Sequence, residues 1–173
     1  MCLMPCQKSH CANNRGNPIP FVAQSPILVW KRLAPKHNDL PYAAKLDPRF
    51  IGAAPYQGTA YFDGHEMPEV TFGFSRSYHF SMNDVEDGYH AYRTEQAAIN
   101  KQRRFSYMDD HTIHPAIIPV GAKVIIGEST RSEIAASRLV VFRDMDSLEK
   151  VYGKVGPGVK VDDAIRTQIL KAS

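Results

Sequence analysis

The chain has 173 residues, of which 43% are apolar and 23% charged, a balance typical of a globular protein able to bury one core. Its formal net charge of +3 does not by itself indicate a nucleic-acid-binding protein, because such proteins cluster lysine and arginine on one face. The sequence contains no apolar run of about eighteen residues and no apolar signal-peptide core at its start, so it predicts a protein without a membrane contact that is in the host cytoplasm at synthesis.

The N-terminal segment combines soft metal ligands with turn-forming residues. The ligand types are Cys2, Cys6, His10 and Cys11. Zinc prefers thiolate and imidazole, but zinc motifs usually pair two short ligand clusters across a longer loop, and adjacent His10 and Cys11 suit one tetrahedral ion badly. We therefore expect no bound metal and no other cofactor. The Asn and Pro content that follows predicts irregular chain over residues 1–24, an arm that contacts other proteins and includes Arg15.

Short runs rich in β-branched and aromatic residues predict three strands in the first half of the chain, at 27–30, 55–62 and 70–80. In the second of these runs, alternation places Tyr56, Ala60 and Phe62 on one face. Prolines between residues 35 and 52 forbid a long helix there and leave room for one turn at 42–46.

The string from Asp87 to Glu95 predicts a strand that leads into a helix. Gly88 allows a tight entry, and residues 89–92 are long enough for one short strand. Thr94 is suited to cap a helix at 95–104, where Ala97, Ala98 and Ile99 form the inner face and the basic residues lie in the last turn.

His90 is the candidate catalytic residue, with Asp87 and Glu95 as nearby carboxylates. A general base needs a pKa near neutrality, an orienting partner and a cleft. Further partners would be Asp84, Glu86, Asp109, Asp110, His111 and His114 if the loop after the helix folds back. Because no ordered triad signature exists and a polar loop contains the same clustered histidines and carboxylates, we expect a structural role for His90.

Arg103, Arg104 and Tyr107 interleave cations with an aromatic ring, as single-stranded nucleic-acid binders do. Five residues do not establish such a function, and a basic helix end followed by chain that re-enters the core explains the same pattern. We treat these residues as candidates for partner binding, with nucleic acid as one alternative partner.

The segment from Ala116 to Phe142 contains two β-rich runs separated by the polar residues 128–132. This pattern predicts a hairpin at the centre of the fold, with Ile118 and Ile126 in the core. After it, the spacing of Asp146 and Glu149 predicts a short helix at 147–152 that ends at Gly153. A brief strand at 159–161 and a last helix from residue 162 complete the chain.

Four strings resemble a loose group of small uncharacterised domains from bacteriophages and bacteria: P-Y-Q-G-T-A-Y-F, D-G-Y-H-A-Y, I-I-P-V-G-A-K-V and E-I-A-A-S-R-L-V-V. Members of that group carry a G-F-H-A-F-like string followed by an I-P-x-G-A-like hairpin. His90 matches the histidine of the group, whereas Tyr89 and Tyr92 replace its two phenylalanines. The resemblance covers about residues 27–142 and implies a compact sheet with one helix in a phage protein, with no chemistry attached.

The sequence thus predicts an α+β protein with one domain at 25–173, built on a mostly antiparallel sheet of five to seven strands with two or three peripheral helices. We expect a non-enzymatic structural or interaction protein, a capsid or tail accessory component of a bacteriophage virion whose partners are other virion proteins. Two alternatives stay open. One is a phage-encoded effector that binds a host protein or nucleic acid, and the other is a small enzyme that uses His90.

Overall fold

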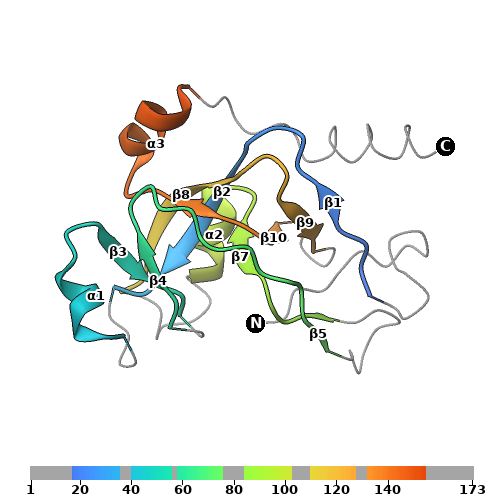
Figure 1. Cartoon of the computed structure of the whole chain (residues 1–173), viewed down its shortest axis with the longest axis horizontal. Coiled ribbons are helices and arrows are strands. Elements are labelled where there is room, and N and C mark those ends of the chain that lie inside the picture. The colour runs from blue at the N-terminus through green and yellow to red at the C-terminus, as the bar shows by residue number, and fades with distance from the viewer. Residues whose placement is uncertain are drawn as a thin grey trace.

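A computed structural model of the chain describes residues 17–35, 40–55, 58–75, 84–102, 110–127 and 132–154 (Figure 1). Within these residues, the main sheet has seven strands in the order β1-β9-β10-β7-β2-β8-β11, and all neighbouring strands are antiparallel. The strands are β1 (Phe21–Val22), β2 (Ile27–Leu33), β7 (Tyr89–Tyr92), β8 (Thr112–Ile118), β9 (Lys123–Ile126), β10 (Glu133–Ala136) and β11 (Val140–Val141).

Two small sheets and three helices flank the main sheet in the described part of the chain. One small sheet pairs β3 (Phe50–Ala53) with β4 (Ala60–Phe62), and the other pairs β5 (Phe74–Ser75) with β6 (Asp84–Val85). The helices are α1 (Tyr42–Leu46), α2 (Glu95–Gln102) and α3 (Met145–Tyr152). In Figure 1, α1, β3 and β4 lie at one end of the molecule and β1 lies at the other. The predicted α+β class with an antiparallel sheet is confirmed.

Apolar side chains are buried on both faces of the main sheet, because successive residues of a strand point to opposite faces. Ile27, Val29 and Leu33 of β2 belong to the largest apolar cluster. Leu28 packs on the other face, against a second cluster that contains Leu148 of α3. The middle of β2 is therefore enclosed from both sides.

The segment 116–142 forms four strands, which corrects the prediction of one central hairpin. Its second part is a hairpin as predicted, since Ile134 of β10 pairs with Ile126 of β9. The first β-rich run is interrupted, however, by a turn at Gly121, whose φ of 82° favours glycine. Because of this turn, β8 leaves β9 and pairs with β2 and β11 instead.

The prediction of irregular chain up to residue 24 was wrong for its last part. Phe21 pairs with Val124 and packs against the largest apolar cluster, and Ala23 is only 2% exposed. The prolines at 18 and 20 suggested an irregular stretch, but the short apolar run that follows them adds a strand to the edge of the sheet. Residues 1–16 lie outside the described part of the chain.

Two predicted strands are shorter than expected. Among the described residues of 55–62 only β4 forms, and its buried side chain is Tyr61, at 1% exposure, in place of Ala60 and Phe62, while Tyr56 lies outside the described residues. From 70–75 only β5 forms, because the Val70 N–H donates instead to the carbonyl of Ser137 at 2.9 Å. Residues 76–80 of this predicted strand, the strand at 159–161 and the last helix lie outside the described residues.

The helices follow their capping residues. The predicted turn at 42–46 is α1. The N–H of Ala97 donates to Thr94 Oγ1 at 3.2 Å, which confirms Thr94 as the cap of α2. In α3 the cap is Asp144, whose carboxylate accepts the N–H of Ser147 at 2.8 Å, so this helix begins two residues earlier than the predicted 147–152.

Candidate functional site

The structure does not assemble His90 with the carboxylates predicted beside it. Asp87 and Glu95 are exposed. The carboxylate of Asp87 lies over Gly73, so close that a Cβ atom added there would be only 2.0 Å from its Oδ2. Because both carboxylates are turned to other surroundings, they do not orient the imidazole as a catalytic partner would.

His90 instead has the environment of a structural histidine. Burial, followed by the nearby charge of Lys31, lowers the pKa of His90 to about 4, although a hydrogen bond with the Glu86 backbone opposes this shift. The ring atom Nε2 is buried and has no hydrogen-bond partner. An imidazole with this pKa is neutral at pH 7 and accepts a proton weakly. These features agree with the predicted structural role.

The other histidines proposed as partners have contacts of their own. Both ring nitrogens of the buried His114 are hydrogen bonded, Nδ1 to the carbonyl of Arg143 at 3.0 Å and Nε2 to Thr112 Oγ1 at 2.7 Å. His111 lies 4.0 Å from the exposed carboxylate of Asp110. No catalytic triad is formed by these groups within the described residues.

Lys31 is a buried amine that the sequence analysis did not single out. Only 6% exposed, its side chain lies on the same sheet face as the largest apolar cluster. Its Nζ atom donates to the carbonyl of His90 at 2.6 Å and sits 5.2 Å from the ring centroid of Tyr61. Burial, and to a smaller degree the adjacent charge of Arg32, lowers the pKa of Lys31 to about 7.

The ring of Tyr61 lies next to this amine and packs against the ring of Tyr89. Their rings meet edge to face, with centroids 6.4 Å apart and planes at 77°. The hydroxyl of Tyr89 donates to the carbonyl of Pro68 at 2.8 Å. Burial raises the pKa of both phenols, so neither supplies a negative charge that would compensate Lys31 at neutral pH.

Arg32 is buried on the opposite face of β2, at 4% exposure. Its Nε and Nη1 atoms are inaccessible to solvent and have no hydrogen-bond partner. The charge of Arg32 also contributes to the lowered pKa of His111, whose main cause is burial, so that imidazole lies within electrostatic range of the guanidinium. In the antiparallel register that pairs Trp30 with Tyr92, Arg32 stands opposite His90 on this face, and we call Arg32, His90 and His111 the basic cluster.

The signal for this cluster was present in the sequence but was assigned to another cause. The predicted strand at 27–30 ends just before Lys31 and Arg32, a basic pair typical of a polar strand end, whereas β2 continues through them to Leu33. Leu33 and Ala34 are both buried, so apolar residues on both sides of the basic pair were the available clue.

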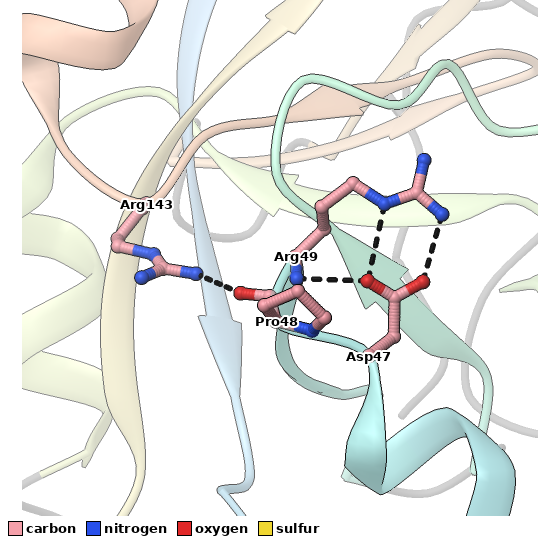
Figure 2. A network of polar contacts seen from close by, with 4 residues as sticks. All are labelled: Asp47, Pro48, Arg49 and Arg143. Carbon is pink, nitrogen blue, oxygen red and sulfur yellow. Dashed lines mark hydrogen bonds and ion pairs between the residues drawn. The ribbon is translucent and has the colours of Figure 1, made fainter.

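A second, contrasting group of polar side chains lies on the surface around the end of α1 (Figure 2). Arg49 contacts both carboxylate oxygens of Asp47, through Nε at 3.1 Å and Nη2 at 2.7 Å, and its own N–H donates to the same carboxylate at 2.9 Å. These hydrogen bonds lower the pKa of Asp47 to about 2. Arg143 donates to the carbonyl of Pro48 at 2.7 Å. We call Asp47, Arg49 and Arg143 the surface network.

The remaining candidate residues lie outside the described residues, and their predicted roles stay predictions. They are the metal candidates Cys2, Cys6, His10 and Cys11 and the partner-binding candidates Arg15, Arg103, Arg104 and Tyr107. Among the residues that the structure describes, no group of three or more His, Cys, Asp or Glu side chains could hold a metal ion. In the same residues, no helix is both long and apolar enough to cross a membrane.

Comparison with known proteins gives no relative from which a role could be transferred. No family model matches the chain, and neither a curated protein nor a solved structure is significantly similar to it. The functional argument therefore depends on the residues themselves and on the sequence resemblance described above.

Proposed function

We propose that this chain is a non-enzymatic interaction protein, a capsid or tail accessory component of a bacteriophage virion. The phage context comes from the resemblance of its sequence strings. The observation that supports an interaction role is a set of exposed, branched apolar side chains at the β1 end of the sheet: Ile19 at 55% exposure, Val22 at 41% and Val120 at 53%.

These three side chains are carried by one hydrogen-bonded unit. The Gly121 N–H, next to Val120, donates to the carbonyl of Ala23 at 2.8 Å, and the Ala23 N–H donates to the carbonyl of Ala122 at 2.9 Å. Val22 pairs with Lys123 of β9 in the same sheet. Single exposed apolar residues are ordinary on a protein surface, but several of them in one ordered unit are typical of a surface that contacts another protein.

The same unit includes the last part of the N-terminal segment, residues 1–24, that we predict to be an interaction arm. Ile19 and Val22 lie within that segment, so arm and apolar surface would contact one partner together. The environment of His90 supports the non-enzymatic part of the proposal, because a buried imidazole whose pKa is lowered to about 4 is a poor general base at neutral pH.

Mass spectrometry of purified phage particles tests this proposal, since a virion component must be present there in stoichiometric amounts. We expect Val120→Glu to reduce incorporation into particles, because it places a charge in the apolar surface. Val151→Glu on α3 is the matched control, since Val151 is a valine at 66% exposure that lies elsewhere. A chain that is abundant in infected cells but missing from particles would contradict the proposal and favour the effector alternative.

A further inference from the structure

The basic cluster contains a cation for which the described protein offers no counter-charge. Arg32 is only 4% exposed to solvent, and two of its three guanidinium nitrogens lack a hydrogen-bond partner. A buried charged donor without a partner is strongly unfavourable, and buried arginines are normally retained with a carboxylate or phosphate.

The residues around Arg32 are basic as well and do not supply the missing negative charge. Lys31 is its neighbour in sequence, and the nearby His90 and His111 are also basic. In the described residues, Asp110 places a carboxylate 4.0 Å from His111, but this side chain is 70% exposed. Glu133, in the same sheet, is already paired with Lys101 at 3.1 Å.

Arg32 lies near one end of the two central strands. It is the second-last residue of β2, and its partner Ile113 is the second residue of β8. Beyond this point, Pro35 and Thr112 are exposed. A small ligand would enter at this end of the two strands, beside these exposed residues.

From these observations we infer that the basic cluster is a binding site for a small carboxylate, held by the guanidinium of Arg32. This inference goes beyond the proposed interaction role, and either can fail without the other. A guanidinium matches a carboxylate because its N–H donors lie in one plane with the two acceptor oxygens.

The number of charges favours a carboxylate over a phosphate. Arg32 is the permanent cation of the cluster, since His90 is neutral at pH 7 and the amine of Lys31 lies on the opposite face of the sheet. One carboxylate balances one guanidinium. A phosphate group, with a charge of about −1.5 to −2 at neutral pH, would leave an excess of buried negative charge.

The test measures thermal unfolding of the full chain at pH 7.5 in increasing sodium acetate, with sodium chloride added to keep the ionic strength constant. We expect acetate to raise Tm by about 4 °C at a tenfold excess over its Kd, in a saturable manner. Arg32→Met keeps an unbranched apolar stem without the guanidinium, and it should lose this rise.

Arg49→Gln is the matched control, because Arg49 is an arginine whose guanidinium already contacts Asp47. It should respond to acetate as the unaltered protein does, which separates specific binding from a general salt effect. An equal rise of Tm in Arg32→Met, or a larger rise with phosphate than with acetate at equal ionic strength, would overturn the inference.

A second measurement uses the unaltered protein and does not depend on the folding of a variant. The Nε–H signal of Arg32, assigned by NMR through its backbone, should shift saturably with acetate while that of Arg49 stays in place. If the Arg32 signal does not move, the guanidinium does not hold a carboxylate and the inference is wrong. This result would leave the proposed virion role unaffected.

Discussion

Arg32 and Arg49 are the same side chain in opposite surroundings. Arg49 is exposed, and its guanidinium meets a carboxylate through two hydrogen bonds with Asp47 (Figure 2). Arg32 is buried, and its Nε and Nη1 atoms meet no acceptor. The satisfied pair contributes little to stability because water competes with it, whereas the unsatisfied one is expensive because water is excluded.

This difference shows where charge matters in the molecule. In the surface network, geometry is nearly ideal and the energetic consequence is small. In the basic cluster, each protonation changes the free energy of unfolding, because the cost of a charge depends on its surroundings more than on its number of neighbours. The four predictions below test this contrast, beginning with the largest expected effect.

Introducing a new buried charge should be the most damaging change. Ile118 of β8 is fully buried, and Ile118→Asp should lower the free energy of unfolding by roughly 3 kcal/mol or more, because a carboxylate without a partner would enter the largest apolar cluster. Chemical denaturation measures this loss. Ile19→Asp, at a position that is 55% exposed, is the control and should be close to neutral. A cooperative Ile118→Asp protein of normal stability would show that β8 is misplaced.

Acidification should destabilise the protein through His90. The folded pKa of His90 is about 4 and its ordinary value is 6.5, so between these pH values the unfolded chain binds a proton that the folded protein refuses. Stability therefore falls as pH decreases from 6.5 to 4, by about 3 kcal/mol from this group.

His90→Gln removes the titration and keeps a hydrogen-bonding side chain, so it should fold almost normally at pH 7 and lose less stability than the unaltered protein on going to pH 4.5. His65→Gln, at an exposed histidine, is the control. Equal acid sensitivity of the unaltered protein and His90→Gln, measured by urea denaturation, would contradict the burial of this imidazole.

Alkaline conditions should stabilise the protein through Lys31. Its pKa is lowered from 10.5 to about 7, so above pH 7 the folded protein releases a proton that the unfolded chain keeps, and stability rises with pH. The rise should approach roughly 2 kcal/mol between pH 7 and pH 9. In Lys31→Met this component should vanish, whereas Lys45→Met at an exposed site should preserve it. Parallel stability curves for the unaltered protein and Lys31→Met would show that the amine is ordinary.

Breaking the surface network should have the smallest effect. Asp47→Asn removes the charge partner of Arg49, yet Tm should change by no more than about 2 °C, and by less at high salt, because the pair is exposed. Since the pKa of Asp47 is lowered to about 2, its contribution is present above pH 3.8 and disappears as pH falls toward 2. A loss as large as that of Ile118→Asp would reverse the contrast between the two regions.

Local patterns predicted much of the fold. The cap at Thr94, the turn at 42–46 and the strand at 89–92 depend on neighbouring residues, and each appears where local chemistry placed it. Errors arose where a distant partner decides. The edge strand at Phe21 exists because β9 is available to pair with it, and β8 leaves β9 because β2 provides a longer partner.

The candidate site was harder to predict for the same reason. His90 was recognised because its string is distinctive, but the burial that lowers its pKa comes from the folded chain around it. Lys31 and Arg32 resembled an ordinary polar strand end, and nothing local indicates that Tyr61, thirty residues later, covers the amine. Burial of a charge is a property of the whole fold, so a single sequence without distant contacts does not reveal it.

The bond from Lys31 to the His90 carbonyl also determines how the sheet is joined at its middle. Strand β2 is in register with β8 over its whole length, from Ile27 to Leu33, but with β7 only at Trp30 and Tyr92 within the described residues. The hydrogen bond from the Lys31 amine to the His90 carbonyl thus connects β2 and β7 next to their one described residue pair. We therefore expect the strands on the two sides of the β2–β7 boundary to unfold as two cooperative units. Their amide hydrogens should exchange at different rates once the hydrogen bond from Lys31 is broken.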